Sequence, residues 1–296
     1  VDDTDPLNVR VGNPGLKPSF TNTLMAFYNT FDPEKQRGIM THLRFNSVLN
    51  SVSNKMLYNS STGGYIITPV NINGNWDMFA MLGLNSALKN KKFTINTFSM
   101  ARYNNMVGYM RLEKAQAGGN DKNTTRQLTL MERLRGTYRN DWFEFSLNGS
   151  INYMHSRNSL QAQNNMDTYQ FAYGASTNVN LPWNMSISTD ISQNSRRGYA
   201  DASMNRDELL WNAQISQNFL KGNAATVSVQ VYDILRQQSN LSRTISAMMR
   251  QDTEYNSIYN YVMVHFIYRL NLFGKGVKPP MQGPAFGPGP HRMRRM

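Results

Sequence analysis

Cysteine is absent from this 296-residue chain, and its absence removes several kinds of chemistry at once. A chain without cysteine forms no disulfide, offers no thiolate to a zinc ion and contains no cysteine nucleophile. The four histidines stand far apart and show no metal-ligand spacing such as H-E-x-x-H. They are His42, His155, His265 and His291. We therefore expect no bound metal, and structural or cavity-lining roles for the histidines.

Catalytic patterns are also missing from the sequence. No serine–histidine–aspartate or paired-carboxylate arrangement can be argued from the spacing of these residues. The stretch "AGGNDKN", residues 117–123, has no lysine–serine pair after it and no strand-to-helix context, so it is not a phosphate-binding loop. The acidic opening, Asp2, Asp3 and Asp5, lacks the glycine and the terminal glutamate of a calcium loop. We expect a protein that is not an enzyme and uses no cofactor.

Long apolar runs are missing too. No run of about 18 apolar residues occurs, so the sequence contains no candidate transmembrane helix. The mean hydropathy is −0.54, yet 40% of the residues are hydrophobic, which is enough to fold. A transmembrane β-barrel is compatible with both values, because only every second residue of each strand faces lipid. Composition alone does not separate such a barrel from a soluble β protein.

Acidic residues are few, since 19 aspartates and glutamates stand against 31 lysines and arginines, for a formal net charge of +12. The basic residues are scattered, and no basic segment interleaved with aromatics appears. Nucleic acid is therefore not an expected partner. The excess charge indicates a solvated surface or contact with anionic lipid headgroups.

Alternation between apolar and polar residues is abundant. In "WFEFSLNGSINYM" the side chains of Phe143, Phe145, Leu147, Ile151 and Tyr153 share one face, and polar residues occupy the other. The same two-residue period returns along most of the chain, whereas the helical period is hard to find. We count about eleven such runs and predict an all-β protein. Most runs reach the length of about nine to eleven residues that a tilted membrane strand needs.

The connectors between these runs alternate in length. The short ones are "DPEKQR", "NKK", "RND", "LPWN" and "LKGN", and the long ones cover about 59–73, 112–124, 158–166, 194–206 and 236–256. Outer-membrane barrels have short periplasmic turns and long external loops. The sequence therefore predicts an antiparallel transmembrane β-barrel in the bacterial outer membrane, with long loops extracellular and with outer-membrane lipid and lipopolysaccharide as partners.

Four tryptophans lie close to predicted strand ends. Trp142 and Trp183 border short connectors, while Trp76 and Trp211 border long ones. Indole rings favour the headgroup level of a membrane, so we interpret these residues as interfacial aromatics. Large aromatics also occur at strand ends in soluble β proteins, and that interpretation stays open.

The order of the connectors indicates an incomplete barrel. The first and the last strand both run toward the short-turn side, which places residues 1–18 outside the cell. A bacterial single-chain barrel has an even number of strands. We therefore predict the C-terminal half of a barrel of about 22 strands, a size associated with plugged outer-membrane transporters. Residues 1–273 are assigned to this barrel, and residues 274–296, rich in proline and glycine, to a flexible basic tail in the periplasm.

Both ends of the chain resemble a known family. "GNPGLKPS", residues 12–19, resembles the "NP-x-LKPE" signature that precedes a mid-barrel strand in TonB-dependent receptors, with Ser19 in place of the usual acidic residue. "VQVYDILRQQSNLSRTI" and "YNYVMVHFIYRLNLFG" resemble the last hairpin of receptor-like outer-membrane barrels whose full-length members carry an N-terminal carboxypeptidase-regulatory-like domain. The resemblance implies an outer-membrane barrel whose plug, signal peptide and any TonB-contacting segment lie upstream of Val1, and the strand count adds the N-terminal half of the barrel as a partner.

Candidate site residues follow from the predicted strand faces. Arg133, Arg135 and Arg139, joined by Glu144, are predicted to line the lumen and to contact carboxylates of the plug. Simple hydration of these side chains in the lumen stays open as the alternative. Strict alternation turns Glu132 toward lipid near the centre of its strand, where a charge is costly. We expect a β-bulge there, while contact with a partner subunit and a salt bridge to a neighbouring strand stay open as explanations.

The long connectors supply further candidates for contacts with a ligand or a surface lipoprotein, namely Tyr65, Tyr199, Met248 and Met249. The favoured function is nutrient uptake across the outer membrane by a TonB-dependent receptor-like protein with an upstream plug. One alternative is a non-transporting structural barrel subunit of an outer-membrane complex. Another is a soluble extracellular β-sandwich adhesin, in which the apolar faces would form an internal core.

Overall fold

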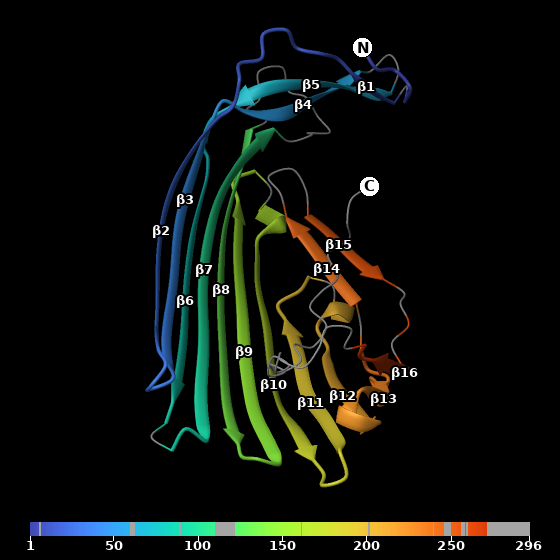
Figure 1. Ribbon diagram of the computed structural model, residues 1–296. Coiled ribbons are helices and arrows are strands. Elements are labelled where there is room, and N and C mark those ends of the chain that lie inside the picture. Colours follow the sequence, from blue (N-terminus) through green and yellow to red (C-terminus); the bar gives the residue numbers. More distant parts are fainter. Residues whose placement is uncertain are drawn as a thin grey trace.

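A curved wall of antiparallel strands dominates the computed structural model of the chain (Figure 1). The structure describes residues 1–5, 7–59, 63–88, 90–109, 122–160, 162–200, 202–238, 240–245, 250–255, 258 and 260–270. The predicted tail at 274–296, as well as Met248 and Met249, lies outside the described residues. Among the described residues, no helix is long and apolar enough to cross a membrane.

The wall is one sheet of eleven strands, as the alternation predicts. From one edge to the other its strands are β2 (Phe20–Asp32), β3 (Arg37–Leu49), β6 (Asn75–Ala87), β7 (Phe93–Tyr109), β8 (Lys122–Arg139), β9 (Phe143–Asn158), β10 (Met166–Asn180), β11 (Met185–Arg197), β12 (Asp207–Phe219), β13 (Ala225–Tyr232) and β16 (Tyr261–Tyr268). Neighbours pair antiparallel throughout. Within the described part of the chain, β2 and β16 are the two edges of this sheet.

The alternation of connector lengths is confirmed. The short turns, at 33–36, 88–92, 140–142, 181–184 and 220–224, gather at one end of the wall (Figure 1). Several of them reverse the chain through a residue of positive φ, such as Gln36, Lys91 and Asn184. The long connectors begin and end at the opposite end of the strands.

Two long connectors form small sheets of their own. β4 (Ser51–Asn59) and β5 (Gly64–Ile72) pair antiparallel, and β1 (Asn8–Arg10) adds to β5 in parallel. The Asn71 amide fixes the entry to β2, because its oxygen accepts from the Lys17 backbone N–H and its nitrogen donates to the Lys17 carbonyl. The turn-rich opening of the chain thus packs along the first long connector. β14 (Asn240–Ile245) and β15 (Arg250–Tyr255) form a hairpin in the last one.

The register puts apolar and polar residues on opposite faces of the wall. One row of partners runs through Leu134, Gly149 and Tyr173, on the convex face. The neighbouring row runs through Arg133, Ser150 and Ala172, on the hollow face. Large apolar side chains on the convex face stay exposed, for example Leu147 at 58% and Tyr173 at 61%. These side chains therefore form an uncovered apolar surface rather than a dry interior.

In the described part of the chain, three short 3-10 helices lie in connectors: η1 (Ala162–Asn164), η2 (Ala202–Met204) and η3 (Lys221–Asn223).

Candidate functional site

A pocket of about 420 Å³ lies on the hollow face of the wall. Side chains from β8 to β12 form its floor, and two long connectors reach over it. Its lining includes Arg133, Asn152, Gln170, Arg196, Tyr199, Glu208 and Gln238. We name it the inner pocket. Its walls are mainly polar, in contrast to the convex face.

A buried ion pair forms one side of the inner pocket. Arg196 on β11 donates from Nη2 to Glu208 Oε1 on β12 at 2.6 Å. The two side chains are only 15% and 5% exposed. A carboxylate this buried needs a cationic partner, since an unpaired charge in such a place costs several kcal/mol, of the order of 3–5 kcal/mol. The pair therefore fixes the distance between β11 and β12 at their long-connector ends.

Tyr199 enters the inner pocket because the chain turns sharply at Gly198. Gly198 has φ +82, and a Cβ atom there would lie 1.9 Å from the carbonyl oxygen of Asp167. Only glycine allows this approach. Tyr199 is 6% exposed, and its hydroxyl accepts a hydrogen bond from the Gln170 side chain. Asn205 holds the connector by bonding both the N–H and the carbonyl of Tyr199.

The connector after β13 enters the same pocket through a turn held by Asp233. Asp233 is 1% exposed. Its carboxylate accepts hydrogen bonds from the backbone N–H groups of Gln237 and Gln238 at 3.0 and 2.9 Å. The Asp233 N–H donates to Asn212 Oδ1 on β12. This arrangement holds Gln238 at the pocket.

The arginines predicted to line the lumen all lie on the hollow face, but their surroundings differ. Arg139 binds Glu144 at 2.6 Å, so its charge is balanced within the chain. Arg135 donates to the Ser146 hydroxyl at 3.3 Å. Among the described residues, neither Arg133 nor Arg135 has an acidic partner. Their contact with plug carboxylates stays a prediction.

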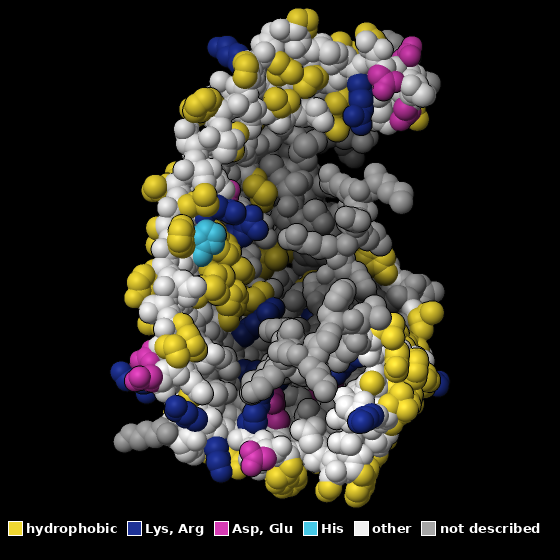
Figure 2. Space-filling view, viewed as in Figure 1, with side chains coloured by type: hydrophobic (Ala, Val, Ile, Leu, Met, Phe, Trp, Pro, Cys, Tyr) yellow, Lys and Arg dark blue, Asp and Glu magenta, His cyan; other side chains and the backbone are white. Residues whose placement is uncertain are grey.

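The hollow face also carries apolar side chains, contrary to strict polar-in alternation. Met25, Phe27 and Phe31 on β2 and Met40 on β3 point to this side, and their exposed fractions are 61%, 85%, 60% and 45%. We call these four residues the inner apolar patch. In Figure 2, hydrophobic side chains lie beside lysines and arginines on the hollow side of the wall.

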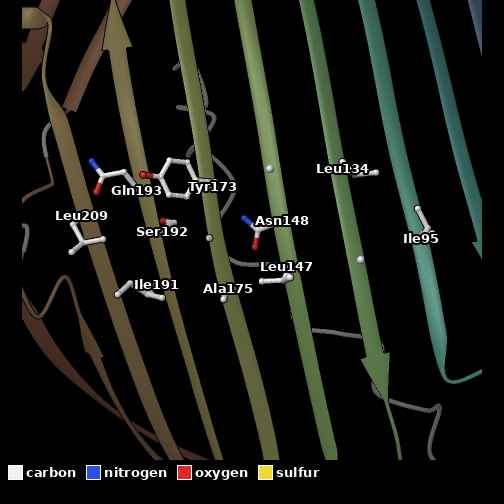
Figure 3. A pocket seen from close by; sticks show the side chains of 13 residues that line it. Ile95, Leu134, Leu147, Asn148, Tyr173, Ala175, Ile191, Ser192, Gln193 and Leu209 are labelled. Atoms are coloured by element: carbon white, nitrogen blue, oxygen red, sulfur yellow. The ribbon is translucent and has the colours of Figure 1, made fainter.

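A wider hollow of about 780 Å³ lies on the convex face, and Figure 3 shows side chains that line it. Small residues on the outward rows, Gly136, Gly149 and Ala175, lower the surface between taller neighbours. Tyr173 on β10 reaches toward β11 beside Gln193 (Figure 3). We call this hollow the outer groove. Its lining is almost wholly apolar, so it suits acyl chains or the apolar side of a partner protein.

Glu132 faces outward just beyond the outer groove. The pairing of β8 with β7 and β9 continues through Glu132 without an extra residue, so the expected β-bulge is wrong. Instead the Thr97 hydroxyl donates to Glu132 Oε1 at 2.5 Å, and Ser99 is its register partner. No salt bridge to a neighbouring strand forms among the described residues. Contact with a partner subunit stays a prediction.

The acidic opening does not form a metal site. Asp2 accepts hydrogen bonds from Thr4, which lower the pKa of its carboxyl, and bonds from Asn8 and the Leu7 N–H do the same for Asp5. Both carboxylates are thus engaged within their loop. No three histidine, aspartate or glutamate side chains in the described part of the chain come together to hold a metal ion.

Comparison with known families is decisive for the class of protein. The model of the outer membrane protein beta-barrel family matches residues 1–139 and 133–268. The chain belongs to this family. As a member, it resides in the bacterial outer membrane. No curated protein and no solved structure matches the chain. The apolar convex face is therefore the side that meets lipid, and the soluble-adhesin interpretation is replaced.

Two aromatic clusters mark the limits of the lipid-facing band. At the short-turn end Phe93 packs against Tyr138 at 4.7 Å, and at the other end Tyr153 stacks on Tyr169 at 4.8 Å. Phe93 and Tyr103 are ten residues apart on β7, as are Phe143 and Tyr153 on β9. Ten residues span about 33 Å along a strand, or about 23–27 Å across the membrane at the usual tilt. This equals the apolar band of an outer-membrane barrel, which is about 25 Å tall.

The positions of the tryptophans are compatible with this apolar band. Trp142 and Trp183 are 58% and 61% exposed in short turns. Trp76 stacks on Tyr103 at 5.1 Å, and Trp211, on the outward row of β12, donates from its indole to Thr189 at 2.9 Å. Their contact with headgroups stays a prediction.

Several pocket residues were missed by sequence reasoning. The alternation pattern does not predict the pair of Arg196 and Glu208, because their pairing depends on register across a long connector. The turn at Asp233 has a local signal. An aspartate directly after a strand is a turn signal, since its side chain bonds the following N–H groups, and that signal was available in "VYDILRQQ". Tyr199, in contrast, was named as a ligand-contact candidate and lies in the inner pocket.

Proposed function

We propose that the chain forms part of the barrel of a TonB-dependent receptor-like protein that takes up a nutrient across the outer membrane, with a plug inside the lumen. The observation that carries this proposal is the mixed character of the hollow face. Phe27 on this face is 85% exposed. In a water-filled pore this side chain would stay in water, which costs about 1.5–3 kcal/mol relative to burial. A packed body inside the lumen would cover it.

Charge on the hollow face supports the same proposal. Three cations there are matched by acids of the same sheet: Arg44 with Asp77, Arg139 with Glu144 and Arg196 with Glu208. Arg133 and Arg135 have no such match among the described residues. Carboxylates of a plug would bind their guanidinium groups through charge-assisted hydrogen bonds.

The sheet edges favour a larger barrel. In β2 every residue except the last is exposed, and the strand is apolar on both faces. β16 is almost as exposed. An unpaired edge of this kind in a membrane is costly, because lipid cannot satisfy its N–H and C=O groups. We propose that further strands pair with β2 and β16 and complete a barrel of about 22 strands.

Conductance of the full-length protein in planar bilayers tests for the plug. We expect the wild type to be closed, and the charge-reversed variant R133E/R135E to open more often because repulsion loosens the plug. K92E, a charge reversal in a short turn, serves as the control and should stay closed. A wild type that conducts as a permanently open pore, or a variant that behaves like K92E, would refute a plug held by these arginines.

Transport is tested in cells. A strain lacking the gene is grown on a panel of bulky nutrients, each supplied as the sole source of carbon, nitrogen or iron, with and without the wild-type gene. Uptake predicts a growth defect on at least one of them that the gene restores. Unchanged growth on every nutrient would count against transport.

A second candidate function is that of a structural subunit in an outer-membrane complex. Glu132 is the observation that favours it, because this carboxylate faces the lipid side inside the apolar band and lies next to the outer groove. A polar group of a partner subunit would offset its cost. Blue-native electrophoresis distinguishes the two functions: loss of a larger assembly in E132A, with growth unchanged, favours the structural subunit.

A further inference from the structure

The convex face carries a polar cluster immediately beyond the stacked pair of Tyr153 and Tyr169, on the side of the long connectors. It consists of Arg126 on β8, His155 and Arg157 on β9, and Asp167 on β10, all on outward rows. On β9, His155 and Arg157 follow Tyr153, which stacks on Tyr169 and marks the end of the apolar band. The cluster therefore lies at the level of the outer-leaflet headgroups. We call it the rim cluster.

One carboxylate organises the rim cluster. Asp167 accepts from the Tyr153 hydroxyl at 2.8 Å, from His155 Nδ1 at 2.6 Å and from Arg157 Nη2 at 2.7 Å. Because Nδ1 faces the carboxylate, the other ring nitrogen of His155 is left for an outside group. Arg157 also donates from Nη1 to the carbonyls of Ser156 and Met166, so its guanidinium is held in place.

Arg126 makes the rim cluster electropositive. It is the register partner of Arg157 across the β8–β9 pair. Like charges directly opposite on one face of a sheet destabilise the pair. The side chain of Arg126 is exposed and makes no hydrogen bond or ion pair with any described residue. With one carboxylate against two guanidinium groups, the cluster has an unmatched positive charge.

We propose that the rim cluster is a binding site for a phosphate group of an outer-leaflet glycolipid, with Arg126 and Arg157 as its cationic arms. A phosphate between the two arginines removes their repulsion and accepts from both forks, which planar guanidinium groups do well. The stacked tyrosines below would contact the first atoms of the acyl chains. This site is independent of transport and of any plug, since it lies on the lipid side.

The test is binding of lipid A to the full-length protein in detergent, measured by native mass spectrometry. Three probes are used: bisphosphorylated lipid A, dephosphorylated lipid A and inorganic phosphate. We expect the wild type to prefer the bisphosphorylated form. R126Q should weaken its binding about tenfold, because one charged hydrogen bond is lost at an exposed site. K92Q, which removes a charge at the opposite end, should bind like the wild type.

R157Q provides a second variant, and it should lower affinity by at least as much as R126Q. The folded state of each variant is checked by its heat-modifiable migration in gels. Equal binding of dephosphorylated lipid A would overturn the proposal, and so would wild-type affinity in folded R126Q. Inorganic phosphate that binds as tightly as the lipid would show a site for a soluble anion and would also overturn it.

Discussion

Replacing Glu208 by glutamine tests how much the inner pocket depends on its buried ion pair. The variant keeps the size of the side chain and removes its charge, so Arg196, 15% exposed, loses its ionic contact at 2.6 Å. Breaking a buried pair by neutralising one member costs about 3–5 kcal/mol, because the other charge stays buried. We therefore expect E208Q to lower the folded-to-unfolded ratio by about two to four powers of ten.

The assay is urea unfolding in lipid vesicles, followed by the fluorescence of the four tryptophans. The double variant R196Q/E208Q serves as the control, since it removes both charges and should be closer to the wild type than E208Q. If E208Q and the double variant both unfold within about 0.5 kcal/mol of the wild type, a range typical of surface substitutions, the pair is solvated. The account of the inner pocket would then be wrong.

Two further substitutions probe single contacts. Gly198→Ala should destabilise the protein more than Gly222→Ala in the same unfolding assay, because both glycines have positive φ but only Gly198 lacks room for a Cβ atom. Equal effects would mean that the close approach to Asp167 does not matter. Thr97→Val removes the hydroxyl that donates to Glu132 and should cost about 1.5–3 kcal/mol, the usual range for a hydrogen bond to a charged group. The same change in an E132Q background should cost less, and equal costs in both backgrounds would contradict the hydrogen bond.

Strands and connectors could be predicted because their signals are local. Alternation within "WFEFSLNGSINYM" decides the face of every residue of β9, and connector lengths are read directly from the chain. The pairing of strands through short turns follows from these signals, since a short turn fixes register. The eleven-stranded sheet could therefore be predicted from the sequence alone.

The inner pocket could not be predicted from the sequence, because it depends on the way in which the long connectors fold back. Arg196 and Glu208 are separated by the connector 198–206, whose length leaves the register of β12 undetermined. Tyr199 faces inward only because Gly198 permits a conformation that no alternation pattern encodes. The sequence predicts a β-bulge at Glu132, because a charge facing lipid is costly and a change of register would turn it inward. The structure keeps the register and supplies a hydrogen bond from Thr97 instead.

The first strand of the wall, β2, exposes large apolar side chains on both of its faces. In β2, Leu24 and Tyr28 face the convex side, while Met25 and Phe27 face the hollow side, and all four are at least 60% exposed. Lipid accounts for the convex pair. For the hollow pair neither lipid nor water is a suitable neighbour, because lipid does not enter a lumen and water penalises both side chains. On the proposal of a plugged barrel, apolar contact from the plug would cover this strand, whereas hydration suffices for the polar floor beneath β9 to β11. The proposed plug should accordingly pack against β2 and β3, in the half of the wall that does not hold the inner pocket.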